Sequence, residues 1–224
     1  MRLNFLSGLL MRSLAKQLRK PSGRMAKRVG KKMNESNSPL YDFALDAMQL
    51  AEGDNILEIG FGNGKFFDKI FSRKNNLKIS GLDYSAEMVN EARSNNQDAI
   101  SAGYLTMRYG NSDKIPFPDN NFDKVFCINV VYFWDQPEKH LQEIHRVLKP
   151  GGKFYSVLSA KETMMKLPFT KYGFARYSQD EWESILKNNH FNMSEVKKLA
   201  EPELKFGDKT YQNQSLCFIA EKKN

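Results

Sequence analysis

Three glycines that follow an apolar strand pattern carry the first chemical signal in this sequence. The apolar run ends in Glu58, and glycines then occupy every second position at Gly60, Gly62 and Gly64. Glycine permits positive φ and leaves peptide N–H groups open to a ligand, because no Cβ stands in the way. The spacing therefore predicts a strand-to-helix turn that cradles a small polar molecule.

A second acid extends this pattern. Residues 77–82 are predicted as a short strand ending in Asp83, whose carboxylate could accept hydrogen bonds from both ribose hydroxyls of an adenosine. The spacing G-x-G-x-G differs from the dinucleotide fingerprint G-x-G-x-x-G, and an acid lies two places before the first glycine. This combination favours S-adenosylmethionine over NAD. Ser85 is the expected N-cap of the next helix, with Glu87 in its first turn.

Alternating strands and helices must position these residues. The apolar patterns predict helices over 65–73 and 137–148, and a capping box in which Ser178 precedes Glu181 by three residues. The last two strands are expected to form an antiparallel pair, joined by a loop through Gly207 and Asp208. The predicted strands are 56–59, 77–82, 104–109, 124–131, 153–159, 193–199 and 215–221.

This ordered set resembles the class I S-adenosylmethionine-dependent methyltransferases, in the branch that includes the ubiquinone/menaquinone C-methyltransferase-like enzymes. The resemblance covers about residues 37–160, including the turn at 149–152. More loosely, the whole chain resembles a bacterial subgroup of uncharacterised small methyltransferases, through the basic segment 19–23 and the Tyr-Phe-Trp phrase at 132–134. The resemblance to the class I methyltransferases implies an α/β fold with a Rossmann-like sheet of seven mostly parallel strands. The last strand is antiparallel, and helices cover both faces.

The resemblance also implies a binding site for S-adenosylmethionine. The turn would hold the methionine end, Asp83 the ribose, and Tyr84 and Met88 the faces of the adenine. Tyr84 and Met88 each have ordinary helix packing as the alternative. The full set implied is Glu58, Gly60, Phe61, Gly62, Gly64, Asp83, Tyr84, Met88, Asn111, Ser112 and Asn129.

Two asparagines depart from the pattern of known relatives. Asn111 stands where many relatives have an aspartate that accepts from the adenine amino group; its amide oxygen can still accept, and a simple turn is the alternative. Asn129 closes the fourth strand and is the best candidate near the transferred methyl group. The sequence Asn129–Tyr132 lacks both prolines of the Asn-Pro-Pro-Tyr motif of nucleic-acid amino methyltransferases, so a nucleic-acid substrate is disfavoured.

The acceptor side of the site is less defined. Three aromatic residues either line an acceptor pocket or cover the core: Tyr132, Phe133 and Trp134. Phe174 is expected in a wall of the same pocket. The segment 164–177 has the composition of a wall for an apolar or aromatic small molecule. Methyl transfer from a sulfonium mainly requires alignment and exclusion of water, so no catalytic residue is assigned. Of the histidines, His140 and His145 are expected to face solvent and sheet, and His190 to cap a helix.

Composition supports one compact domain and excludes several classes. The chain has 224 residues and is 41% hydrophobic, which excludes a disordered protein. Its two cysteines, Cys127 and Cys217, have no zinc or disulfide spacing, so we expect reduced core thiols, a cytoplasmic location and no metal. No apolar run reaches the roughly 18 residues that span a bilayer.

The N-terminal segment is set apart by its charge. The first 34 residues carry +10 without any Asp or Glu, whereas the remaining 190 carry −2. We therefore divide the chain into a basic amphipathic segment, 1–36, and a methyltransferase-like domain, 37–224. One stripe of the expected helix over 3–18 holds Leu3, Leu6, Leu10, Leu14 and Leu18.

Such a segment has several possible roles. The preferred one is a helical cover at the mouth of the active site, and contact of residues 1–20 with a membrane surface comes second. A transit peptide, a nucleic-acid contact and a solvated arm remain as alternatives. The overall expectation is an enzyme that methylates a small-molecule acceptor. Three alternatives remain. The same fold could carry out aminopropyl transfer or NAD-linked reduction, the chain could be a non-catalytic S-adenosylmethionine-binding module, or it could be a nucleic-acid methyltransferase that uses the basic segment.

Overall fold

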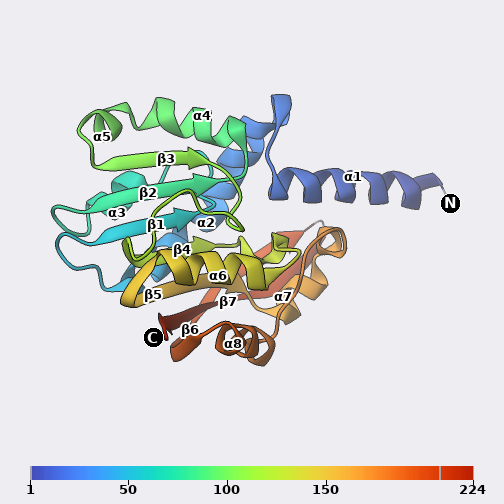
Figure 1. Cartoon of the computed structure of the whole chain (residues 1–224). Helices are drawn as coiled ribbons and strands as arrows, with labels where there is room; N and C mark the ends of the chain where they lie inside the picture. The colour runs from blue at the N-terminus through green and yellow to red at the C-terminus, as the bar shows by residue number, and fades with distance from the viewer. Residues whose placement is uncertain (1, 207, 224) are drawn as a thin grey trace.

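The described chain forms one central sheet with helices on both faces (Figure 1). This computed structural model describes the backbone of residues 2–206 and 208–223, and the side chains of residues 8–203, 208, 210 and 212–223. Within these ranges the sheet has seven strands in the order β3-β2-β1-β4-β5-β7-β6. The strands are β1 (Asn55–Ile59), β2 (Lys78–Asp83), β3 (Leu105–Tyr109), β4 (Phe122–Ile128), β5 (Leu148–Ser159), β6 (Phe191–Phe206) and β7 (Lys209–Lys222).

Strands β1 to β5 are parallel, and β7 runs antiparallel to both β5 and β6. The predicted fold class is thereby confirmed. Crossover connections join the parallel strands, as a parallel sheet requires. The connections that follow β1, β2 and β4 contain helices, whereas the one from β3 to β4 contains none. The helices are α1 (Arg2–Arg19), α2 (Ala26–Met48), α3 (Phe67–Phe71), α4 (Ala86–Asn95), α5 (Gln97–Ser101), α6 (Pro137–Val147), α7 (Lys161–Lys166) and α8 (Gln179–Asn188), with short 3-10 turns η1 (Gly23–Met25), η2 (Val131–Phe133) and η3 (Pro168–Lys171).

Alternation along the strands divides the apolar core into two layers. Ile56 packs with α2, α3 and α4 on one face, while its neighbour Leu57 packs with α6 and α8 on the other. Both cysteines, Cys127 and Cys217, are free and buried in the sheet. Among the described residues, no helix is both long and apolar enough to cross a bilayer.

Several element boundaries differ from those predicted. Strand β5 begins at Leu148 rather than at residue 153, because Leu148 already pairs with Phe122. The Lys-Pro-Gly-Gly sequence forms an irregularity in the register before Lys153 pairs with Lys124. The β6–β7 hairpin is longer than the predicted pair, and the predicted loop residue Gly207 lies outside the described residues. The capping box of Ser178 and Glu181 is confirmed at the start of α8.

The N-terminal region contains more regular structure than the sequence suggested. Helix α1 covers the predicted helix, although the side chains of Leu3 and Leu6 lie outside the description. Helix α2 follows it and runs without a break past residue 36, with Pro39 inside it. Its buried side packs against the sheet through residues such as Tyr41 and Met48. The basic segment and the α/β body therefore share a helix.

Candidate functional site

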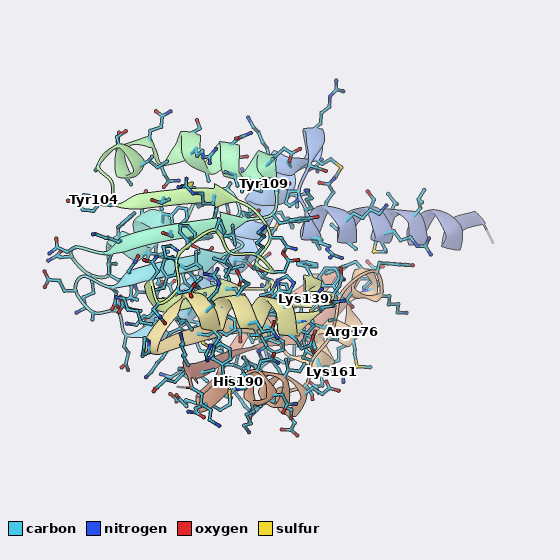
Figure 2. All side chains as sticks on the ribbon, in the orientation of Figure 1. Tyr104, Tyr109, Lys139, Lys161, Arg176 and His190 are labelled. Atoms are coloured by element: carbon cyan, nitrogen blue, oxygen red, sulfur yellow. The ribbon has the colours of Figure 1, made fainter. Side chains whose placement is uncertain are left out.

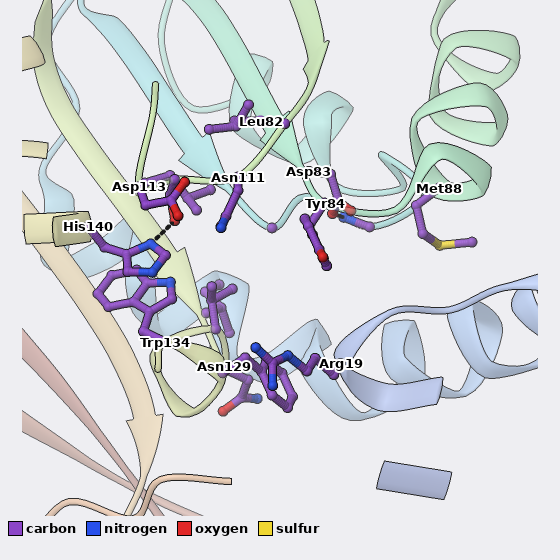
Figure 3. A pocket seen from close by; sticks show the side chains of 18 of the residues that line it. Arg19, Leu82, Asp83, Tyr84, Met88, Asn111, Asp113, Asn129, Trp134 and His140 are labelled. Atoms are coloured by element: carbon purple, nitrogen blue, oxygen red, sulfur yellow. Dashed lines mark hydrogen bonds between the residues drawn. The ribbon is translucent and has the colours of Figure 1, made fainter. Parts of the chain in front are cut away.

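A cavity of about 300 Å³ lies beyond the carboxyl ends of β1, β2 and β4 (Figure 3). The strand order reverses between the neighbours β1 and β4, because the chain continues from β1 to β2 on one side and from β4 to β5 on the other. Ligands bind at such a switch point in open parallel sheets. Most of the predicted cofactor residues line this cavity: Gly60, Gly62, Asp83, Tyr84, Met88, Asn111, Ser112 and Asn129. The other three, Glu58, Phe61 and Gly64, lie outside its lining.

The three glycines of the turn all have positive φ, of 80°, 58° and 68°, and each has its own role. A Cβ on Gly60 would lie 2.4 Å from Val130 Cγ2, and one on Gly64 would lie 2.8 Å from Ala92 Cβ. These two glycines allow close packing. A Cβ on Gly62 would meet nothing within 4 Å, so this position faces open space at the cavity.

Asp83 ends β2 and fixes the glycine turn. Its Oδ2 accepts a hydrogen bond from Gly62 N at 2.8 Å, and its Oδ1 accepts one from Ser85 N at 2.8 Å. Only 9% of the residue is exposed, and this burial raises the pKa of Asp83 to about 6. A carboxylate held by two peptide N–H groups keeps lone pairs for hydroxyl donors in the cavity.

Glu58 lies beneath the cavity wall, with 2% of its surface exposed. Its Oε1 accepts a hydrogen bond from the Tyr41 hydroxyl. Burial raises the pKa of Glu58 to about 8, against the lowering effect of the Tyr41 hydrogen bond. At neutral pH this side chain is mainly protonated and ties α2 to β1.

The pKa of Glu58 leads to a prediction for stability without bound ligand. The native state keeps the proton between the ordinary value of 4.5 and about 8, where the unfolded chain loses it. The stabilising contribution is therefore complete below pH 4.5 and is lost as the pH rises through about 8. Relative to wild type, Glu58→Gln should gain roughly 2–4 kcal/mol between pH 5 and pH 9. Urea unfolding at both pH values measures this gain, and the exposed Glu162→Gln should show none.

His140 corrects a sequence-based expectation, because it lines the cavity instead of facing only solvent and sheet. Its Nδ1 makes a 2.7 Å hydrogen bond with Ser112 Oγ (dashed in Figure 3), and its ring stacks on Trp134 at 4.7 Å between centroids. Burial lowers the pKa of His140 to about 4. The imidazole is therefore neutral at physiological pH and acts as part of the wall.

The junction between α1 and α2 forms part of the wall of this cavity. We call residues 18–21 the leader strap; Leu18, Arg19 and Pro21 all line the cavity. Arg19 pairs with Asp135 at 2.9 Å, and Lys20 Nζ lies 4.1 Å from the centroid of the Tyr84 ring.

The strap is also anchored through its backbone. Ser85 Oγ donates a 2.6 Å hydrogen bond to the carbonyl oxygen of Pro21, so the N-cap of α4 holds the strap in place. Sequence analysis favoured a cover formed by this segment but assigned none of its residues to the site. It also missed Met33 and Asn37 of α2, which line the cavity.

A second, more apolar cavity of about 390 Å³ adjoins the first. Tyr132, Phe133 and Phe174 line it, as does Met164 of α7. Trp134 lies in the first cavity only, on the face occupied by His140. Residues that line both cavities mark where they meet: Leu18, Met33, Asn37, Asn129 and Phe133.

Asn129 is held firmly at this meeting point. It follows β4 with a φ of 58°, and its backbone N donates to Val157 O at 2.8 Å. Its side chain donates to Asn37 Oδ1 and accepts from the Tyr132 hydroxyl, both at 3.0 Å. The Tyr132 hydroxyl in turn accepts from Ser159 N. Within the described residues, no group of three or more His, Cys, Asp or Glu is arranged to hold a metal ion.

Comparisons with known proteins agree with this geometry. Residues 57–156 match the family model described as "Methyltransferase domain". The chain is 28% identical over 130 residues to the uncharacterised methyltransferase YdaC of Bacillus subtilis, covering 58% of this chain and 70% of that protein. It is 30% identical over 112 residues to the ubiquinone/menaquinone biosynthesis C-methyltransferase UbiE of Geotalea daltonii, covering 50% of this chain and 48% of that protein.

A solved structure shows the same fold. An S-adenosylmethionine-dependent methyltransferase from Methanosarcina mazei superposes with a TM-score of 0.62 and 20% identity, over 78% of this chain and 94% of that one. Sheet order, glycine turn and sequence matches together define a class I S-adenosylmethionine-dependent methyltransferase. The matched region, residues 57–156, is similar in sequence to the ubiquinone/menaquinone C-methyltransferases. The donor used by this class is S-adenosylmethionine.

Proposed function

We propose that this protein transfers a methyl group from S-adenosylmethionine to a small, largely apolar acceptor molecule. The observation that carries the proposal is the meeting of two cavities at Asn129 and Phe133. One cavity has the glycine turn and the buried carboxylate expected for the donor, and the other has an apolar lining. Each has a volume within the usual range of small-ligand sites, about 300–1,000 Å³.

The residues of the first cavity fit the donor. Asp83 would accept from the ribose hydroxyls, because its carboxylate is already oriented by two peptide N–H groups. The open face at Gly62 would receive the amino-acid end, while Tyr84 and Met88 would contact the adenine. Glu58 would support the turn from below through Tyr41 rather than touch the donor. When bound, the donor supplies an activated methyl group on a sulfonium.

The residues around the junction would align the reaction. The Tyr132 hydroxyl and Asn37 fix both ends of the Asn129 amide, so this group is preorganised where the methyl group would pass. The aromatic wall of Phe133 and Phe174 would exclude water from the acceptor side. Positioning and exclusion of water are the main requirements for transfer from an activated donor.

A screen with methyl-labelled donor tests this proposal. Purified protein is incubated with apolar amines, alcohols, quinone-like compounds and lipids, and both labelled product and S-adenosylhomocysteine are measured. We expect stoichiometric formation of both with at least one acceptor class. If the donor binds but neither a pure acceptor nor a metabolite extract yields S-adenosylhomocysteine, the non-catalytic binding module is the better description.

We also propose that α1 contacts an anionic membrane surface. The helix projects from the body (Figure 1), and Leu9 and Leu10 are 59% and 65% exposed, on a segment rich in Lys and Arg. Basic helices with exposed apolar residues lie in the interface of anionic bilayers. The two free, buried cysteines support the cytoplasmic side as its location.

Vesicle binding provides the prediction for α1. Leu9→Asp combined with Leu10→Asp should weaken binding to vesicles containing anionic lipid by more than about tenfold, because two apolar insertions are lost and negative charge is added. Co-sedimentation measures the change. Tyr104→Asp is the matched control, since Tyr104 is 51% exposed and lies at the end of the molecule opposite α1 (Figure 2). Equal losses in both proteins would contradict the proposed role of α1.

A further inference from the structure

A β-bulge places an acidic side chain in the acceptor cavity. In the β6–β7 pair, Glu201 lies opposite Asn213, whereas Leu204 lies opposite Tyr211. Strand β6 therefore contains one extra residue next to Pro202. Bulges redirect side chains and are common beside active sites. Glu201 and Asn213 both line the apolar cavity.

Glu201 lines the apolar cavity, and one of its carboxylate oxygens is held by a hydrogen bond. Its Oε1 accepts from the buried Ser215 Oγ at 2.6 Å. Burial raises the pKa of Glu201 above its ordinary value. The pKa of Tyr132 is raised mainly by burial, and the charge on Glu201 adds to this. Glu201 is thus within electrostatic reach of the hydroxyl that orients Asn129.

Asn213 presents an unpaired acceptor in the same cavity. Among the described residues, the buried side-chain oxygen Asn213 Oδ1 has no hydrogen-bond partner. Buried polar atoms nearly always have a partner, so a ligand N–H or O–H that reached this oxygen would satisfy it. The paired positions Glu201 and Asn213 together offer acceptor atoms for two N–H or O–H groups.

The charge of the cavity distinguishes between the ligand N–H and O–H groups that could donate hydrogen bonds to these oxygen atoms. The ionisable residues that line this cavity are Lys32 and Glu35 from α2, Tyr132 from η2, and Glu201 and Glu203 from β6. Three carboxylates against one ammonium favour a cationic ligand. An amine carries both a positive charge and more than one N–H, whereas an alcohol carries a single O–H and no charge.

The histidines offer no alternative proton acceptor for this cavity. His140 belongs to the donor cavity, where Ser112 occupies its Nδ1. His145 contacts the carbonyl oxygen of Lys223 through Nε2 at 3.0 Å, and His190 lies beside it, 6.1 Å away between ring centroids. Both are near the end of β7, and Figure 2 shows His190 on the side of the molecule away from α1.

We propose that the acceptor is an apolar amine and that Glu201 is the general base for its methylation, with Asn213 as a positioning residue. This inference rests on the proposed function. The Glu201 carboxylate takes a proton from the substrate ammonium, and the N–H electron pair stays on nitrogen. The nitrogen then bonds to the methyl carbon while the carbon–sulfur pair stays on sulfur. The products are an N-methylammonium, S-adenosylhomocysteine and protonated Glu201, so charge and atoms balance.

The test compares amines with matched alcohols. Primary amines with phenyl or alkyl tails of increasing length, and the corresponding alcohols, are assayed for S-adenosylhomocysteine formation. We expect wild type to methylate amines and not alcohols. Glu201→Gln should lower kcat at pH 7 by about 100-fold or more while leaving donor affinity unchanged. Glu195→Gln, an exposed residue on the same strand, should retain wild-type kcat.

The pH profile separates a general base from a structural role. Without the base, only free amine reacts, so kcat of Glu201→Gln should rise about tenfold per pH unit from pH 7 to 9, whereas wild type should level off. Asn213→Leu should raise KM for the amine with little change in kcat or in the unfolding midpoint. Unchanged kcat in Glu201→Gln, or a loss with the wild-type pH profile, would overturn the assignment of the base.

The outcomes also distinguish the two proposals. Transfer by wild type to alcohols or carbon acids but to no amine would reject the amine class and leave the proposed methyl transfer standing. Donor binding without transfer to any acceptor would reject the methyl transfer itself, and the amine assignment with it.

Discussion

Gly62→Arg is expected to abolish S-adenosylmethionine binding, with a loss of affinity of more than about 1,000-fold, because a long cationic side chain would occupy the cavity. The Cβ position at Gly62 meets no atom within 4 Å, so the change should fill the ligand site without colliding with the fold. Isothermal titration calorimetry with S-adenosylmethionine or S-adenosylhomocysteine measures this loss.

Backbone strain must be separated from occupation of the cavity. Gly62 has a φ of 58°, which is unfavourable for arginine whatever the surroundings. Gly103 is a suitable control, because it has a φ of 78°, open space around its Cβ position and a place away from the cavity. Gly103→Arg should therefore lower the unfolding temperature about as much and keep donor affinity. Retained affinity in Gly62→Arg would reject the donor site.

Asp83→Ala is expected to weaken donor binding by about 100-fold or more. Hydrogen bonds to a charged group contribute about 1.5–3 kcal/mol each, and the substitution removes the acceptor for the ribose and also the support for Gly62. Asp98→Ala, on the surface helix α5, should leave the affinity within about threefold of wild type. Similar affinity in the two variants would remove the ribose assignment.

The pKa of Asp83 makes the same contact sensitive to pH. Because burial raises this pKa to about 6, the carboxylate becomes protonated as the pH falls through 6 and loses acceptor capacity. Donor affinity in wild type should then fall by up to about tenfold per pH unit below 6. Asp83→Asn should bind weakly with no such dependence. Glu58 is the other carboxyl close enough to influence this titration.

The residues proposed for the donor site could be grouped from the sequence because their signals are local. The three glycines, Asp83 at a strand end and the Ser85 cap each depend on a few neighbouring residues, and the structure places all of them at one edge of the sheet. The sheet topology followed from alternating strand and helix patterns together with the family resemblance.

The residues that were missed depend on tertiary packing. Helix α2 contains the polar run 34–38 followed by Pro39, which is typical of a linker, yet burial of Tyr41 and Met48 stabilises it as helix. His140 is a polar residue on the buried side of α6, a position that periodicity alone does not assign to a ligand cavity. Glu201 stands beside Pro202 in a charged stretch that resembles a loop, so neither the long hairpin nor its bulge was predicted.

The leader strap has a consequence for how the spent donor leaves. Pro21 is tied to the start of α4, Arg19 to Asp135 and Lys20 to Tyr84, so three contacts hold the strap against the cavity. If the donor binds as proposed, its spent form would leave on that side only after these contacts open. The residence time of that ligand would then depend in part on a segment whose other end carries the exposed leucines. A chain that lacks residues 1–21 would exchange its ligand faster, even though the cavity residues at the carboxyl ends of the strands remained in place.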